Sequence, residues 1–168
     1  MTTFTPKFMP SYGTQMVPGR SGDVALPYYR VVKMGDSNGA NFDTKITLAG
    51  VGDTPFGVVV PDVADYHGNS DGSESYKVSY VAGELPKVYT EGIVYVQVAG
   101  AVTSGQELVA AANGFASTYV PVTNAVFTSG YSAANEESIR DEHNLVIGVA
   151  LSSAADQGYV KVQISVRR

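Results

Sequence analysis

The segment Tyr159-Val-Lys-Val-Gln-Ile-Ser-Val166 alternates apolar and polar residues along its whole length. A period of two places successive side chains on opposite faces of an extended strand. The segment therefore predicts a β-strand with one face in a core and the other toward water or a neighbouring subunit. The expected core face is Val160, Val162, Ile164 and Val166, and the expected outer face is Tyr159, Lys161, Gln163 and Ser165.

A second apolar run precedes this strand and predicts a hairpin. Leu145–Leu151 is joined to Tyr159–Val166 by the small and polar residues Ser152–Gly158. Such a connection favours antiparallel pairing, and Gly158 is expected to supply the positive φ that the turn needs. The C-terminal part of the chain is therefore expected to form two neighbouring antiparallel strands.

The composition extends this prediction to the whole chain. Valine occurs 25 times and tyrosine 11 times, mostly in short runs separated by Gly, Asn, Asp, Ser and Pro. Short runs of β-branched and aromatic residues between turn residues are typical of sheets. We expect an all-β chain that forms a compact antiparallel β-barrel or β-sandwich, preferably a closed or nearly closed barrel. The other expected strands are Tyr28–Met34, Lys45–Leu48, Phe56–Val60, Tyr76–Val81, Gly92–Val98, Glu107–Ala112 and Phe115–Val120.

A ten-residue pattern occurs twice in the chain. Phe56–Asp65 and Ile147–Asp156 each combine a hydrophobic residue, a glycine, alternating apolar residues and a small-residue turn that closes on Ala-Asp. Two interpretations stay open: a repeated buried strand and turn, or a coincidence that any valine-rich β protein can produce. A single pair does not indicate a solenoid.

The first 27 residues differ from the rest of the chain. They hold four of the eight prolines, and their apolar residues follow no period of 2 or 3.6. Because proline blocks helices and removes backbone donors, we expect an extended N-terminal arm at 1–27 and a single β domain at 28–168. The arm is expected either to lie against a partner subunit or to wrap its own barrel. Its candidate capsid or partner contacts are Phe4, Phe8, Met9, Tyr12 and Met16.

A polar segment at 128–144 is expected to leave the β domain as a surface excursion. Within it, Ala133–His143 contains a single aliphatic residue, Ile139, which cannot form the apolar face of a helix. Asn135 is a suitable N-cap for a short turn. We therefore expect a polar loop with about one helical turn.

Charge and composition argue against several classes of function. The chain has 16 acidic and 11 basic residues, a net charge of −5, and no basic stripe. Such a surface repels phosphate backbones, so nucleic acid is not an expected partner. The sequence contains no cysteine, no signal-peptide pattern and no apolar stretch of about 18 residues. Neither disulfides nor membrane insertion is expected.

No motif predicts a metal site. The loop Asp62–Glu74 is rich in oxygen ligands, but the chain has His67 and Val78 at positions where an EF-hand loop needs acidic residues. A solvated turn is the favoured interpretation of this loop. His143 has no second histidine or cysteine nearby to complete a zinc site.

Catalysis and cofactor binding are not expected either. Gly50-Val-Gly52 begins like a dinucleotide loop, but Pro55 occupies the place of the third glycine. The chain has no cysteine nucleophile and no Gly-x-Ser-x-Gly elbow. The alternative of a small β-barrel hydrolase would require turnover that depends on His67 or His143.

Three segments taken together carry a family resemblance. They are Phe56-Gly-Val-Val-Val-Pro-Asp62, then Gly92-Ile-Val-Tyr-Val-Gln-Val-Ala-Gly-Ala-Val-Thr-Ser-Gly-Gln-Glu-Leu108, then Val146-Ile-Gly-Val-Ala-Leu-Ser-Ser-Ala-Ala-Asp-Gln-Gly-Tyr-Val-Lys-Val-Gln-Ile164. In this order the chain resembles the capsid decoration, or cement, proteins of tailed bacteriophages. The hallmarks are a Gly-hydrophobic-Ala-Leu strand, a small-residue turn and a closing Val-x-Val-x-Ile strand.

The resemblance implies a compact β domain, commonly a homotrimer, on the outside of an icosahedral phage head. There it would bridge neighbouring subunits of the major capsid protein, as a virion component made in the host cytoplasm and without a small-molecule substrate. The family's extended N-terminal segment corresponds to residues 1–27. The alternative from another class is a head-fibre or receptor- or glycan-binding β module. Its sugar-stacking platform would consist of Tyr76, Tyr80, Tyr89 and Tyr95.

Overall fold

In the computed structural model, the described part of the chain comprises residues 12–16, 21, 24–35, 45–62, 66–68, 74–120 and 145–166. Within these residues the regular structure is β, apart from one short 3₁₀ helix, η2 (Ala112–Gly114), so the all-β prediction is confirmed. The strands are β1 (Tyr12–Met16), β2 (Leu26–Pro27), β3 (Val31–Met34), β4 (Ile46–Leu48), β5 (Gly57–Val60), β6 (Tyr66–Gly68), β7 (Glu74–Tyr76), β8 (Ser79–Tyr80), β9 (Lys87–Gln97), β10 (Glu107–Ala110), β11 (Ala116–Thr118), β12 (Val146–Ala150) and β13 (Tyr159–Ser165).

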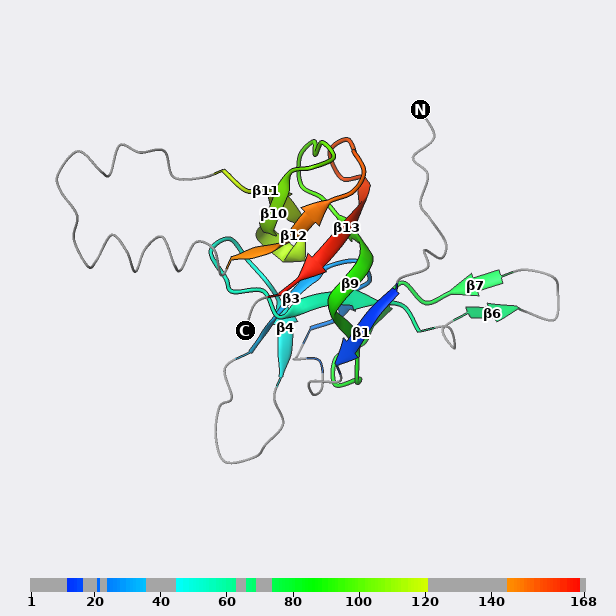
Figure 1. Cartoon of the computed structure of the whole chain (residues 1–168). Helices are drawn as coiled ribbons and strands as arrows, with labels where there is room; N and C mark the ends of the chain where they lie inside the picture. Colours follow the sequence, from blue (N-terminus) through cyan, green and yellow to red (C-terminus); the bar gives the residue numbers. More distant parts are fainter. Residues whose placement is uncertain are drawn as a thin grey trace, which may run out of the picture.

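Nine of these strands form one curled antiparallel sheet (Figure 1). Its order is β11-β10-β12-β13-β9-β5-β3-β4, and β1 pairs with β9 beside this path. The curl brings β11 back to the end of β9, where Val98 and Ala116 form a parallel bridge. The Ala99 N–H donates to the Ala116 carbonyl oxygen at 2.8 Å. The predicted barrel or sandwich class is therefore confirmed.

Strand β9 belongs to two parts of this sheet. Lys87–Tyr89 pairs with β5, whereas Glu91–Gln97 pairs with β13. Because β1 occupies the other edge of β9 from Val88 to Ile93, β5 and β13 must follow each other along a single edge. The change of partner occurs at Thr90, whose carbonyl oxygen accepts the Val166 N–H at 3.2 Å.

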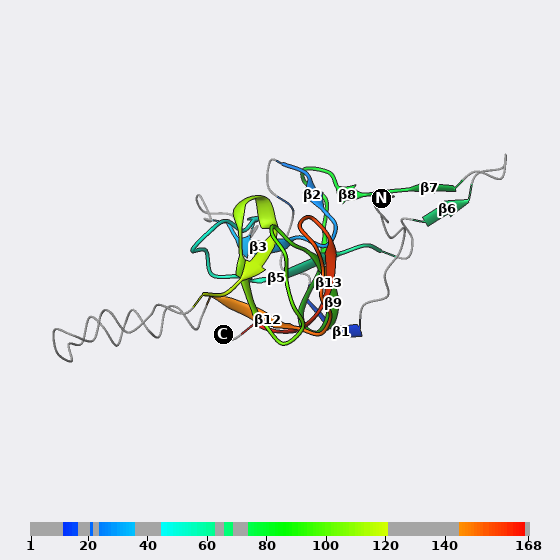
Figure 2. The ribbon, with the colours of Figure 1, turned by 90° about the horizontal axis from the view of Figure 1, so that it is seen from above.

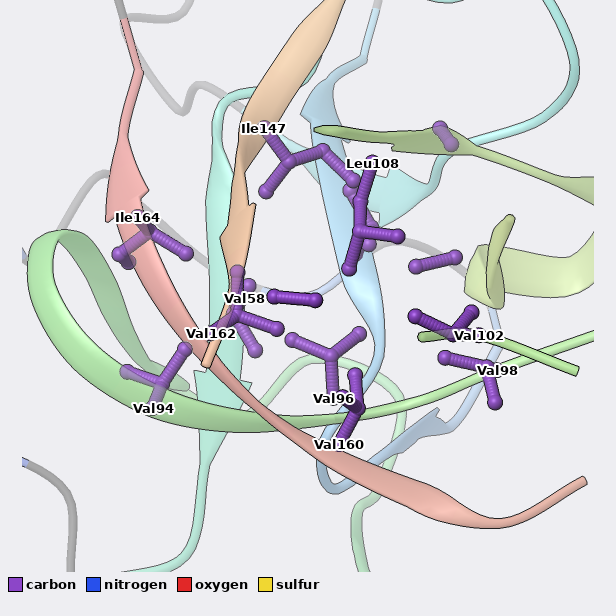
Figure 3. Close-up of a cluster of buried hydrophobic side chains, with 14 of the residues drawn as sticks. Val58, Val94, Val96, Val98, Val102, Leu108, Ile147, Val160, Val162 and Ile164 are labelled. Carbon is purple, nitrogen blue, oxygen red and sulfur yellow. The ribbon is translucent and has the colours of Figure 1, made fainter. Parts of the chain in front are cut away.

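The core has two clusters, one on each face of β3 and β5. The first fills the inside of the curled sheet and is built almost entirely from Val, Ile, Leu and Ala (Figure 3). The second lies between the sheet and the short β2–β8 ribbon, which Figure 2 shows on the opposite side of β3 and β5 from β12. In β5, Val58 and Val60 enter the first cluster and Val59 enters the second. Burial on both faces explains why this strand reads as an unbroken valine run.

The predicted C-terminal hairpin is present, with one correction in its turn. β12 and β13 pair antiparallel, and Val160, Val162 and Ile164 are fully buried, as the alternation predicts. The expected positive φ at Gly158 is wrong, because Gln157 takes this conformation, with φ of 58°. Gly158 is needed for a different reason: a Cβ there would lie 2.9 Å from the Ala155 carbonyl oxygen.

Several predicted strand boundaries move. The strand expected to begin at Tyr28 begins at Val31, because Tyr29 adopts a left-handed φ of 62° and turns the chain. The strand expected to begin at Gly92 already begins at Lys87. The segment expected as one strand from Tyr76 to Val81 is divided between β7 and β8. The polar excursion at 128–144 lies outside the described residues.

The β6–β7 hairpin is a further departure from the sequence-based expectation. Tyr66–Gly68 pairs antiparallel with Glu74–Tyr76 in a separate two-stranded sheet. Figure 1 shows these two strands extending away from the nine-stranded sheet. Among the described residues no helix has the length and hydrophobicity required to cross a membrane.

Candidate functional site

The predicted contact residues of the arm divide into two groups. Phe4, Phe8 and Met9 lie outside the described residues, whereas Tyr12 and Met16 are the first and last residues of β1. The backbone of β1 pairs antiparallel with β9 of the same chain, with Tyr12 opposite Ile93 and Met16 opposite Val88. Over Tyr12–Met16, the arm therefore pairs with the sheet of its own chain. A role of the five named side chains as partner contacts stays a prediction.

The β1–β9 pairing depends on a close backbone approach. Gly13 lies opposite Gly92, and a Cβ on Gly13 would collide with the carbonyl oxygen of Glu91. Gly92 itself has φ of 113°, a conformation that side chains strongly disfavour. The register also shifts between Thr14 and Gln15, opposite Thr90. β1 therefore fits this edge of β9 only through a pair of facing glycines.

Several of the exposed aliphatic side chains in the described residues flank a single ribbon, β2–β8. Six large aliphatic side chains have more than half of their surface exposed, and four of them flank the strands of the β2–β8 ribbon or the turn that follows β8. Exposed apolar residues that gather in one place mark interaction sites more often than isolated ones do. We call this set the apolar turn surface; its members are Val24 (55% exposed), Val78 (72%), Val81 (54%) and Leu85 (58%).

Hydrogen bonds from the backbone and from one side chain hold the turn Val81–Glu84 in place. The Glu84 N–H donates to the Val81 carbonyl oxygen at 3.2 Å. Ser21, which is 3% exposed, donates its Oγ–H to the same oxygen at 2.8 Å and its N–H to the Glu84 carbonyl oxygen at 2.7 Å. Ser21 also bridges to Ile46 at the edge of β4. The turn is thus fastened to the sheet.

The side chain of Glu84 completes this arrangement. One carboxylate oxygen accepts both the Val81 N–H and the Lys77 ammonium, each at 2.7 Å. These two hydrogen bonds lower the pKa of the Glu84 carboxyl, and the one from Lys77 has the larger effect. The ion pair leaves the turn without net charge. The hydrogen bonds fix its shape, so binding to it would not require the turn to become ordered.

One solved structure with a similar architecture is the N base of the head fibre protein gp8.5 of bacteriophage phi29. The superposition has a TM-score of 0.55 and 15% sequence identity, and it covers 95% of this chain and 98% of that chain. The two chains share a fold. No protein-family model matches the sequence, and no curated protein matches it either.

The tyrosines that a glycan-binding module would use are not laid out as an open platform in the described residues. Tyr80 is 5% exposed, and it packs edge-on against Tyr28 with 5.3 Å between ring centroids. Tyr89 is half-buried against the first core cluster and Tyr95 against the second. The side chain of Tyr76 is not among those described. The Tyr80 ring is therefore part of the core, and the Tyr89 and Tyr95 rings pack against it.

The residues considered for metal or cofactor chemistry are not brought together. His67 lies in β6, opposite Ser75, and His143 is outside the described residues. No group of three His, Cys, Asp or Glu side chains suited to a metal occurs in the described ranges. The Gly50-Val-Gly52 stretch is a tight turn: Asp53 accepts the Gly50 N–H at 2.7 Å and the Lys33 ammonium at 2.8 Å.

The apolar turn surface was missed by the sequence-based prediction. Val78 and Val81 both fall within the expected strand Tyr76–Val81, where valine indicates burial. The available signal was the turn Val81-Ala-Gly-Glu84. A turn of this composition is expected at the surface, which brings Val78 and Val81 close to solvent.

Proposed function

We propose that this chain is a structural protein of a phage virion that binds to the outside of the head and contacts the major capsid protein. The observation that carries the proposal is the fold likeness to a phage head-fibre base, which extends over nearly the whole of both chains. The sequence resemblance to capsid decoration proteins over roughly residues 50 to 166 supports the same location. The role requires binding surfaces and no reaction, so no residue is assigned a catalytic role.

Within this proposal the protein acts as a homotrimeric cement. Three linked copies of a modest contact raise avidity by about 10² to 10⁴ without any single contact being tight. The partner contacts include the arm residues Phe4, Phe8, Met9, Tyr12 and Met16. Each trimer would then join neighbouring major capsid protein subunits and resist their separation.

The second candidate function is the base of a head fibre, which attaches to the capsid without reinforcing it. The specific observation in its favour is that the similar solved structure is itself a head-fibre base. A glycan-binding role has less support, because Tyr80 is buried and Tyr89 and Tyr95 are half-buried.

Co-sedimentation with heads that lack this protein tests the shared part of the proposal. Heads from a phage with the corresponding gene deleted are mixed with purified protein and pelleted, with bovine serum albumin as a non-binding control. We expect saturable binding at a fixed ratio to the major capsid protein. Absence of the protein from the pellet at all concentrations would rule out both candidate functions.

Thermal rupture of the same heads separates the two candidates. A cement is expected to raise the temperature at which the heads rupture and release their DNA, in proportion to occupancy. The released DNA is detected with a DNA-binding dye. A fibre base is expected to bind equally well and leave that temperature unchanged. Electron cryomicroscopy of the saturated heads would count the copies at each site and test the expected three-fold arrangement.

A further inference from the structure

The N-terminal leader and the apolar turn surface have complementary properties. The leader, residues 1–11, precedes β1 and carries Phe4, Phe8 and Met9 with a single charged side chain, Lys7. The apolar turn surface offers four exposed aliphatic side chains on a turn that is already fixed by hydrogen bonds. Binding to a preorganised surface avoids the entropy cost of ordering it.

The direction of β1 carries the leader away from the apolar turn surface of its own chain. That surface ends at Leu85, immediately before β9 begins at Lys87, and Met16 lies near this end of β9. Tyr12, where the leader joins β1, lies opposite Ile93 instead. The two ends of β1 are separated by about 16 Å along β9, at about 3.3 Å per residue. The leader therefore joins β1 at the end that is more distant from the apolar turn surface. A straight continuation beyond Tyr12 would increase its distance from that surface of its own chain.

The leader's own sequence favours a straight continuation. Pro6 and Pro10 fix their φ angles near extended values and restrict the residues before them in the same way. Eleven extended residues reach at most about 36 to 40 Å. This length is enough to cross to an adjacent molecule, whereas a return to the same chain's surface would require a reversal close to Pro10.

Charge permits a second copy at this surface. The chain has a net charge of −5, so two copies repel each other on average. The stretch from Lys77 to Leu85 contains only one base and one acid, and these are paired with each other at 2.7 Å. Two acidic molecules can meet here without opposing like charges.

We propose that the leader of one copy docks on the apolar turn surface of a second copy of this chain. The contact is heterologous, because each copy presents a leader on one side and a surface on another. Such a contact closes into a ring when its rotation divides the circle evenly, which suits the proposed trimer. The inference rests on the proposed function only for the trimeric stoichiometry, and the contact itself is tested without heads.

Cysteine cross-linking tests the contact, since the natural chain has no cysteine. Purified Phe8→Cys protein is mixed with isotopically heavy Leu85→Cys protein, oxidised and run on a non-reducing gel. We expect a disulfide-linked pair of one light and one heavy chain, formed roughly tenfold or more over the pair from Phe8→Cys and Val120→Cys. Val120 is a matched control because it is 77% exposed and follows β11 at one end of the sheet order, whereas Leu85 precedes β9 in the middle of it.

Three results would overturn the proposal. The first is cross-linking to Val120→Cys as efficient as to Leu85→Cys. The second is a Phe8→Cys, Leu85→Cys double variant that closes only within one chain, which would place the leader on its own surface. The third is no linked species at all. Binding of the unmodified protein to heads is measured separately, so failure of the contact and failure of the virion role are distinguishable.

The oligomeric mass gives an independent readout. By light scattering, Phe8→Ser and Leu85→Ser should each shift the protein toward monomer, and the double variant should shift it no further than the stronger single variant. Val120→Ser should leave the mass unchanged. Circular dichroism spectra equal to that of the unmodified protein would show that the variants are folded. Fully additive effects of the two substitutions would contradict a direct contact between the two sites.

Discussion

Gly13 and Glu91 are in backbone contact across the β1–β9 ladder, so close that a methyl group on Gly13 would collide with the Glu91 carbonyl oxygen. We predict that Gly13→Ala separates β1 from β9 and lowers the free energy of unfolding by about 1 to 3 kcal/mol. Hydrogen exchange of the β9 amides that face β1 should become faster. Gln163→Ala is the control, because Gln163 is exposed and faces Ile93 from the β13 edge. Unchanged exchange in Gly13→Ala would show that the contact is not needed.

Leu108 is fully buried in the first core cluster. Leu108→Ala should lower the free energy of unfolding by about 2 to 5 kcal/mol, because it removes buried apolar surface and leaves a cavity. Val120→Ala, at a side chain that is 77% exposed, should change it by less than about 0.5 kcal/mol. Urea titrations followed by far-ultraviolet circular dichroism measure both. Equal losses in the two variants would contradict the assignment of the core.

Acid should weaken the turn that Glu84 holds. Hydrogen bonds from Lys77 and Val81 lower the pKa of the folded-state Glu84 carboxyl. Its stabilising contribution is therefore complete above the pKa of the unfolded chain and is lost as the pH falls through the lower, folded pKa. Because the side chain is 36% exposed, the contribution is at most about 1 kcal/mol.

The Glu84→Gln variant isolates this contribution. Between about pH 5.5 and about pH 3, the urea midpoint of the natural chain should fall more than that of Glu84→Gln. A smaller fall should persist in the variant, since Lys33 and the Gly50 N–H lower the pKa of the Asp53 carboxyl in the same manner. Identical falls in the two proteins would show that Glu84 contributes nothing.

Arg30 links β3 to the segment before β11. Its guanidinium carbon lies 3.3 Å from the centroid of the Phe115 ring, and a terminal nitrogen donates to the Asn113 carbonyl oxygen at 3.1 Å. Burial lowers the pKa of Arg30, while the Tyr159 hydroxyl acts in the opposite direction. A double-mutant cycle with Arg30→Met and Phe115→Leu should give a favourable coupling of about 1 to 2 kcal/mol. The Lys161 and Tyr95 pair, at 5.9 Å, should give less than about 0.5 kcal/mol, and equal couplings would contradict a specific contact.

Local periodicity predicted the parts of the fold whose signal lies within a few consecutive residues. The alternation of Tyr159–Ser165 identified both the strand and its buried face. The unbroken valines of Gly57–Val60 identified a buried strand, although not that a second layer covers it. In both cases the side chains of one strand report directly on which faces are apolar.

The remaining features depend on partners far away in the sequence. Tyr29 turns the chain because its carbonyl oxygen accepts the Gln97 N–H and its N–H donates to the Val59 carbonyl oxygen. The residues next to Tyr29 in the sequence do not predict these contacts. The exposed positions of Val78 and Val81 follow from where the β2–β8 ribbon ends. Valine in a strand pattern predicts burial, and the sequence does not state which element is available to cover it.

The repeated ten-residue pattern also did not predict which strands lie next to each copy. Gly57 and Gly148 occupy equivalent places, and a Cβ on either would collide with a carbonyl oxygen of the neighbouring strand, that of Tyr89 or of Gln163. The two strands nevertheless have different neighbours, since β5 lies between β3 and β9 and β12 lies between β10 and β13. The repeated glycine thus reports a close approach of strands and not a duplicated position in the sheet.

The shared role of β9 limits how this chain can change in length. One inserted or deleted residue between Thr90 and Gln97 would turn every following side chain to the opposite face of the strand. Val94 and Val96 would then point outward while Tyr95 pointed inward, and the hydrogen bonds to β1 and β13 would slip together. Evolutionary gains and losses of residues are therefore expected in the connections between strands and not within β9.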